Sequence, residues 1–231
     1  MSPDELAADV ATACRILAAE GQEHTVLGHV SARAPGATAM QVKPAGMGLA
    51  EVRPEDLLTL GLDGGLLEGT RPIHAEMPIH TGIYEQRPDV NAVVHTHPLH
   101  VAALAASAAE FRMVNQDSIQ FADGIGFHPS STLIVTAEQG QALAAALGDK
   151  RAVVLKNHGL VTVGATVQEA VFLAVSFVNS LRVQVMATQF GPLTCIPADE
   201  VEEMARYFAG GYEQRVNSTW DYLRRIHPTS A

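Results

Sequence analysis

Two histidines separated by one residue are the strongest chemical signal in this sequence. His95 and His97 lie in VVHTHP, part of a predicted β-strand over residues 90–97. Alternate side chains of a strand point to one face, so both imidazoles can reach one metal ion. His158 lies in LKNHGLVT, in a predicted turn between two apolar strands, and three imidazole ligands leave a coordination position open for substrate. Taken separately, an exposed histidine pair and a turn histidine bonded to backbone are the favoured interpretations of these residues.

Glu76 is the candidate carboxylate of the site, and it lies before this strand in the sequence. It lies in a predicted helix over residues 75–86, between His74 and His80. The segment HAEMPIH does not match the HExxH zinc motif, because Ala75 separates the first histidine from the glutamate. From the residues alone, a solvated glutamate on a surface helix is the favoured interpretation.

The elements that would position these residues mix helices and strands without regular strand–helix–strand units. Ser2 to Glu5 form a capping box, and Asp63-Gly64 is a good two-residue hairpin turn. Closely spaced strand pairs need antiparallel neighbours, so we expect one α/β layered domain over residues 1–231 with a central, mostly antiparallel sheet. The predicted helices cover residues 3–20, 75–86, 98–106, 136–147, 167–190 and 198–226, the last interrupted at Gly210-Gly211; strands are predicted within 27–46, 57–67, 90–97, 111–114, 132–135, 152–156 and 160–163; residues 118–129 are expected to be irregular.

Composition restricts the partners and the compartment. A hydrophobic share of 47% and a charged share of 17% are typical of a globular domain. The formal net charge of −10 disfavours a nucleic-acid partner, which requires basic clusters. The apolar stretch 167–190 carries five polar or charged side chains, so a buried helix is expected and no membrane partner. The N-terminus lacks a secretory pattern, and we expect a cytoplasmic protein with Cys14 and Cys195 as buried thiols.

Four stretches resemble the class II aldolase/adducin family, typified by fuculose-phosphate aldolase. They are GHVSAR (28–33), KPAGMG with VRPEDLLTL (43–48 and 52–60), AEMPIHTGIYEQRPDVNAVVHTHP (75–98) and LKNHGLVTVGATVQEA (155–170). The resemblance covers roughly residues 5 to 190. It implies an α/β/α layered fold and a homotetramer whose active sites lie between subunits.

The resemblance also implies the roles of the candidate site residues. By position, His95, His97 and His158 match the family's metal-binding histidines, and Glu76 matches its catalytic acid/base, which can also ligate the metal. Such a donor set suits Zn²⁺ best, while Mn²⁺, Fe²⁺ and Co²⁺ can occupy similar sites. The implied activity is that of a divalent-metal-dependent lyase, in which the metal stabilises an enediolate as a carbon–carbon bond breaks. Aldol cleavage, epimerisation and decarboxylation share this machinery, so the fold does not select the reaction.

This chain departs from the sugar-phosphate aldolases where they bind phosphate. His29 stands where those enzymes have Asn, Ala45 where they usually have Thr, and His74-Ala75 where they usually have Ser-Ser. The sugar aldolases' tyrosine acid has no counterpart near residues 115–117. We therefore expect decarboxylation of a non-phosphorylated hydroxy- or keto-carboxylic acid, of aromatic or β-keto type, as in family members that share the GHVS variant.

The candidate substrate-binding residues come from several of these motifs. Arg33 fits a structural ion pair equally well, Lys43 by itself fits a surface lysine better, and Gln116 fits a loop cap as well as a pocket wall. Four other functions stay open: an aldolase of a sugar-derived or 2-keto-acid substrate, a metal-dependent oxygenase, another lyase, dehydratase or epimerase, and a non-catalytic adducin-like interaction module. The candidates are His29, Ser31, Arg33, Lys43, Gly46, His74 and Gln116.

Overall fold

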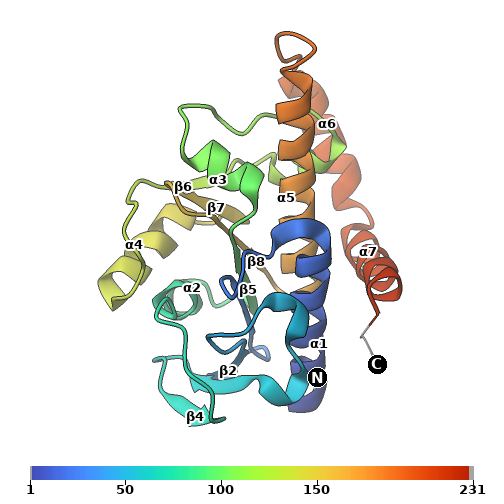
Figure 1. Ribbon diagram of the computed structural model, residues 1–231. Coiled ribbons are helices and arrows are strands. Elements are labelled where there is room, and N and C mark those ends of the chain that lie inside the picture. Colours follow the sequence, from blue (N-terminus) through green and yellow to red (C-terminus); the bar gives the residue numbers. More distant parts are fainter. Residues whose placement is uncertain (1, 229–231) are drawn as a thin grey trace.

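Eight short strands pair into one sheet that lies between two layers of helices (Figure 1). The computed structural model describes residues 2–228. The sheet order is β4-β3-β2-β1-β5-β8-β7-β6, and only β6 and β7 pair in parallel. The strands are β1 (His29–Ala32), β2 (Ala39–Val42), β3 (Leu58–Gly61), β4 (Leu66–Glu68), β5 (Ala92–Thr96), β6 (Gly126–His128), β7 (Ala152–Leu155) and β8 (Leu160–Gly164).

Seven α-helices and four shorter helical segments make up the remaining regular structure of the described residues. Ser2, Thr136 and Thr166 cap α1, α4 and α5, as their hydroxyls accept backbone N–H groups at the helix starts. The helices are α1 (Pro3–Leu17), α2 (Pro78–Gln86), α3 (Leu99–Ala105), α4 (Ala137–Leu147), α5 (Val167–Ala187), α6 (Ala198–Ala209) and α7 (Tyr212–Ile226); the π-helical segment is η1 (Ala18–Gln22), and the 3-10 segments are η2 (Leu49–Glu51), η3 (Pro54–Asp56) and η4 (Gln116–Phe121).

Alternation along the central strands gives each face of the sheet its own core. Val30 on β1 and Val94 on β5 pack with apolar residues of α1 and α5. Val93 on β5 packs instead with residues of α2 and α4 on the opposite face. Figure 1 shows the resulting order, with α2 and α4 on one side of the sheet and α1, α5 and α7 on the other. The predicted α/β/α layered domain with a mostly antiparallel sheet is confirmed.

The long apolar helix α5 is a core element. By length and composition it could cross a membrane, but 67% of its most apolar stretch is buried inside the molecule. It packs against β8, α1 and α7. Because both long sides of α5 face protein, an apolar sequence is what its position requires.

Three predictions about local structure are wrong. The segments 111–114 and 132–135 are loop rather than strand, and the backbone N–H of Ile134 donates to Glu76 instead of to a neighbouring strand. The strand β6 lies within the stretch expected to be irregular, because pairing with β7 stabilises a segment too short to have a recognisable pattern. The helix predicted from residue 75 begins at Pro78, which leaves Glu76 in the preceding turn.

The two cysteines differ in environment. Cys14 is buried on α1, and burial raises the pKa of its thiol to about 12. Cys195 is exposed, so the prediction that both thiols are buried is wrong for this residue. Both are free thiols.

Candidate metal centre and active site

His95 comes from the middle of the sheet, and the sheet sets which of its nitrogens is available. Its Nδ1 lies 3.0 Å from the carbonyl oxygen of Leu160 on the neighbouring β8. A carbonyl can only accept, so Nδ1 carries the hydrogen and Nε2 keeps its lone pair. Nε2 is buried and has no hydrogen-bond partner among the described residues. The strand therefore presents a neutral imidazole with a free ligand atom.

His97 and His158 approach from two separate segments. His97 follows the last residue of β5 by one position, so its ring lies on the same side of the sheet as His95. His158 lies in the turn between β7 and β8, where Asn157 adopts a φ of 53°. The turn packs so closely on the end of β5 that a Cβ atom on Gly159 would lie 2.5 Å from the carbonyl oxygen of Thr96. Glycine at this position therefore permits the approach of His158 to His97.

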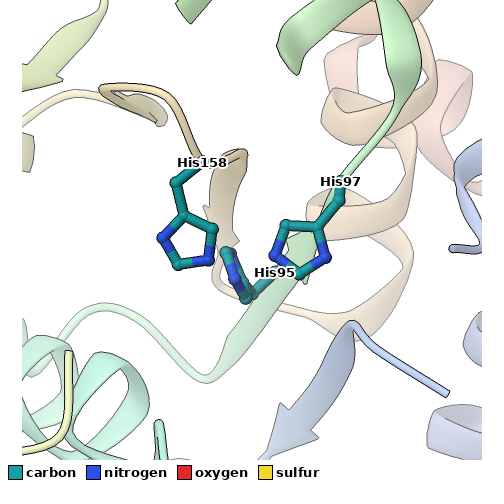
Figure 2. A group of neighbouring side chains, drawn as sticks. All are labelled: His95, His97 and His158. Carbon is teal, nitrogen blue, oxygen red and sulfur yellow. The ribbon is translucent and has the colours of Figure 1, made fainter. Parts of the chain in front are cut away.

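The three rings meet between the end of β5 and the β7–β8 turn, as Figure 2 shows. One ring nitrogen from each of His95, His97 and His158 lies within 4.8 Å of the others. Neither nitrogen of His97 has a hydrogen-bond partner in the described part of the chain. Buried imidazole nitrogens without partners are costly unless a ligand satisfies them, and a divalent cation is the ligand that this donor set fits.

Burial keeps the imidazoles of His95 and His97 in the neutral form. It holds the pKa of His95 well below its ordinary value and lowers that of His97 to about 4, with neighbouring histidines adding to both effects. Neutral imidazole is the form that coordinates a metal. The site is therefore electrostatically prepared for a cation.

Glu76 faces the histidines from the turn before α2. Its Oε1 accepts a hydrogen bond of 3.1 Å from the backbone N–H of Ile134, and its Oε2 lies 3.6 Å from Nε2 of His158. A carboxylate oxygen of Glu76 also lies within 4.8 Å of a ring nitrogen of both His29 and His95. One oxygen is thus held by backbone, and the other is free to ligate a metal or carry a proton.

A cleft of about 460 Å³ opens beside these residues. His97, His158 and Glu76 line its polar side. Leu27, Leu99 and Leu133 line it as well, and each has an exposed side chain. The sequence offered no signal for these leucines, because they come from three separate loops or helix starts. A polar end next to an apolar wall suits an organic acid with a flat or apolar body.

A second set of polar residues lies behind the site. Cross-strand pairing places His29 of β1 directly opposite His95 of β5. Nδ1 of His29 lies 2.6 Å from Nε2 of His80, whose Nδ1 lies 2.6 Å from Oγ of Ser31, and that oxygen is 2.8 Å from the Tyr84 hydroxyl. All four side chains are buried. His80 and Tyr84 were absent from the predicted site, although their spacing of four residues on one helix face was a usable signal.

Burial dominates the protonation of this set. It holds the pKa of His29 well below its ordinary value and lowers that of His80 to about 3. Burial also raises the pKa of Tyr84, so the phenol keeps its proton. The set is therefore a chain of neutral donors and acceptors.

Lys43 and His74 extend the polar wall beside His29. Lys43 is fully buried rather than on the surface, and its Nζ donates to the carbonyls of Val26 and Pro44 and lies 3.4 Å from Nε2 of His74. Burial lowers the pKa of Lys43, and burial together with the lysine charge lowers that of His74 to about 4. The His74 and His29 ring centroids are 4.6 Å apart. His74 therefore links Lys43 to His29, which lies opposite His95.

Arg33 and Gln116, two predicted substrate-binding residues, lie away from the histidine cluster. Gly46, a third, is on an exposed loop. Arg33 donates to the carbonyls of Tyr84, Arg87, Pro88 and Val90, so its guanidinium holds the α2–β5 connection and is not available as a substrate anchor. Gln116 is exposed on η4, which packs against α5 and α6. Gly46 is exposed in the loop after β2, with a φ of +79°.

Comparison with known proteins relates the chain to one family and to named relatives. Residues 8–185 match the family model described as the Class II Aldolase and Adducin N-terminal domain. The chain is 32% identical over 209 residues to a 3,4-dihydroxyphthalate decarboxylase of Arthrobacter keyseri, covering 84% of each protein. It is 30% identical over 173 residues to a 5-deoxy-D-ribulose 1-phosphate aldolase of Bacillus thuringiensis, covering 75% of this chain and 81% of the relative.

A solved structure shares the fold. The L-fuculose 1-phosphate aldolase of Glaciozyma antarctica PI12 superposes with a TM-score of 0.85 at 27% identity, covering 96% of this chain and 90% of that one. Relatives of both kinds, decarboxylase and aldolase, carry out lyase reactions.

Proposed function

Because this chain belongs to the class II aldolase and adducin family and is a lyase, we propose that it decarboxylates a non-phosphorylated hydroxy- or keto-carboxylic acid. The observation that carries the proposal is the convergence of three imidazoles and one carboxylate at the mouth of a partly apolar cleft. The name of the 32% identical relative supports an aromatic acid with adjacent hydroxyl groups as the first substrate to test.

We assign the metal to His95, His97 and His158, with Glu76 as acid/base or fourth ligand. The unpartnered buried nitrogens of His95 and His97 fit a divalent cation, and Zn²⁺ suits imidazole ligands best. When bound, the cation would act as a Lewis acid for an oxygen next to the bond that breaks.

The remaining chemistry belongs to the protein side chains. Glu76 is held at Oε1 by the Ile134 N–H, so Oε2 is the atom that would store a proton and deliver it to the carbon that loses carbon dioxide. His29 and His74 lie beside the metal-site histidines and are suited to orient the substrate carboxylate. Leu27, Leu99 and Leu133 would cover the flat face of the acid and exclude water.

The proposal is tested by metal analysis together with carbon dioxide release from 3,4-dihydroxyphthalate. We expect about one zinc, manganese, iron or cobalt ion per chain and metal-dependent release of carbon dioxide. Purified protein without any of these metals, or metal-loaded protein inert toward a panel of hydroxylated aromatic and β-keto acids, would contradict it.

Glu76→Gln is expected to retain the metal and lose turnover. Glutamine keeps the shape but cannot carry the proton, so kcat should fall by about 10²- to 10⁴-fold. Metal content by elemental analysis and kcat are measured together. Glu203→Gln, at an exposed site on α6, serves as the matched control and should match the parent protein.

Aldol cleavage of a sugar phosphate is the second candidate. Two names favour it, the 30% identical ribulose-phosphate aldolase and the superposed fuculose-phosphate aldolase. The buried Lys43 next to His74 offers a cation for an anionic group. Formation of an aldehyde from 5-deoxyribulose 1-phosphate, with no carbon dioxide from the aromatic acids, would favour this candidate.

We further propose a cytoplasmic homotetramer with active sites at its subunit interfaces. Exposed apolar side chains gather at the end of α5 and just after it, where Val183, Val185, Met186 and Phe190 all face solvent in the single chain. Burial of this surface against another copy would remove it from water. Sedimentation velocity measures the oligomeric state directly.

A further inference from the structure

The four buried side chains behind the metal site form a continuous line of polar contacts with one open end. The line runs from the Tyr84 hydroxyl through Ser31 and His80 to His29, with successive heavy-atom distances of 2.8, 2.6 and 2.6 Å. Among the described residues these side chains make no other hydrogen bonds, and Nε2 of His29 takes part in none of them. That nitrogen is the only place where the line can continue.

The hydrogen atoms along this line have one arrangement that gives every donor from Tyr84 to His80 an acceptor and leaves only the Nε2–H of His29, at the open end, for an outside group. Each imidazole carries one proton, since a buried imidazolium without an anion partner is costly. If Tyr84 donates to Ser31, then Ser31 donates to Nδ1 of His80, and Nε2 of His80 donates to Nδ1 of His29. In the opposite direction the Tyr84 hydroxyl hydrogen would be buried without an acceptor. Such an unmet donor costs more than the hydrogen bond is worth.

The charges at the two ends favour the same direction. The guanidinium of Arg33 lies over the Tyr84 ring, 4.6 Å from its centroid, which places a positive charge at the Tyr84 end of the line. A carboxylate oxygen of Glu76 lies within 4.8 Å of a His29 nitrogen at the other end and attracts an N–H. The dipoles of the line are therefore aligned from Arg33 toward Glu76.

We propose that Tyr84, Ser31 and His80 fix His29 in the tautomer with hydrogen on Nε2, so that His29 is a hydrogen-bond donor to a substrate carboxylate oxygen and not a metal ligand. The adjacent His95 has the opposite tautomer, because its Nδ1–H donates to the Leu160 carbonyl. Two imidazoles with centroids 4.9 Å apart thus have divided roles, one as a ligand and one as a donor. The carboxylate part of this assignment depends on the proposed function, whereas the tautomer does not.

Histidine-selective ¹⁵N correlation spectra of the zinc-loaded protein test the tautomer without any substrate. We expect hydrogen on Nε2 and a lone pair on Nδ1 for both His29 and His80, with assignments from His29→Gln and His80→Gln. Hydrogen on Nδ1 of His29 would overturn the proposal.

Phthalate is then added as a stable dicarboxylate and should shift the His29 Nε2–H resonance, whereas catechol, which lacks the carboxylates, should not. Failure of saturating phthalate to move that signal overturns the donor role.

Variants separate positioning from packing. Ser31→Ala breaks the line, so His29 should show both tautomers, and KM for 3,4-dihydroxyphthalate should rise about tenfold with kcat changed less than about twofold. Ser31→Thr keeps the hydroxyl and should restore a single tautomer. Should Ser31 variants fold poorly, Tyr84→Phe is the milder change and should shift the tautomer ratio, with Tyr207→Phe on an exposed helix as its control.

The two proposals fail in different ways. Carbon dioxide release together with hydrogen on Nδ1 of His29 rejects the directed line and retains the decarboxylase. The expected tautomer in a protein that releases no carbon dioxide from any acid rejects the decarboxylase and retains the line. A single unchanged tautomer in Ser31→Ala would show that the line does not set it.

Discussion

At Gly159 a single missing methyl group lets His97 and His158, two ligands of the proposed metal site, approach each other. A Cβ at this position would lie 2.5 Å from the carbonyl oxygen of Thr96 and 2.7 Å from Cδ2 of His97. Neither a backbone carbonyl of a central strand nor a packed imidazole can move far without disturbing the site. The residue that shapes the site is therefore not one of its ligands.

Gly159→Ala should weaken metal binding although the residue ligates nothing. The added methyl pushes His97 away from His158, and a loss of about 10- to 100-fold in zinc affinity is expected from such an indirect displacement. Competition with a chromogenic chelator measures it. Gly210→Ala is the control, since a Cβ there meets only the Tyr207 carbonyl at 3.4 Å; equal affinities for the two variants would contradict the prediction.

At the scale of elements, the contact between α2 and α4 decides where Glu76 and His80 lie. A Cβ on Gly82 would lie 2.6 Å from the backbone of Gly140, and one on Gly140 would lie 2.3 Å from the carbonyl oxygen of Pro78. The two helices touch backbone to backbone at this point. The start of α2, which carries His80 and directly follows the turn with Glu76, is thereby held against the sheet.

Gly140→Ala should destabilise the fold even though alanine favours helices. Helix propensity alone would stabilise the protein by about 1 kcal/mol. Separating the two backbones outweighs that gain, and the net destabilisation is roughly 1–3 kcal/mol. Urea unfolding measures the net effect. Ala142→Gly, on the exposed face of α4, should also destabilise by about 1 kcal/mol, through propensity alone. A more stable Gly140→Ala protein would contradict close helix contact.

At the scale of the whole molecule, buried neutral histidines make stability depend on pH. Burial lowers the pKa of His80 from 6.5 to about 3 in the folded protein. Between these values the unfolded chain binds more protons than the folded one, so the free energy of unfolding falls as the pH falls. The stabilisation is complete above the unfolded pKa of 6.5 and is lost progressively toward the folded pKa of about 3.

We therefore expect metal-free protein to lose stability on acidification. Each such histidine contributes a slope of up to about 1.4 kcal/mol per pH unit below the unfolded pKa. Urea unfolding at about pH 7 and about pH 5 measures the total, and His80→Gln should reduce the difference by one histidine's share. Equal stability of the parent protein at both pH values would contradict the prediction.

Local signals in the sequence were sufficient for much of the fold. Capping residues such as Ser2, Thr136 and Thr166 act within one helical turn, so the helices they begin could be placed without the tertiary structure. The alternation of strand side chains likewise placed His95 and His97 on one side, because that relation is internal to the strand. The class II aldolase/adducin resemblance is confirmed as well.

Only the tertiary structure decided which residues from distant parts of the chain lie next to these locally predicted ones. Cross-strand register put His29 opposite His95, and packing of α2 brought His80 to His29. Backbone carbonyls accept the hydrogen bonds of Arg33, which was predicted to anchor a substrate carboxylate. Pairing with β7 likewise made a strand of β6. These outcomes depend on contacts between residues far apart in the chain, whose register and orientation no nearby residue determines. Spacing in the sequence therefore predicted which side chains are candidates for the site, and packing determined which of them point into it.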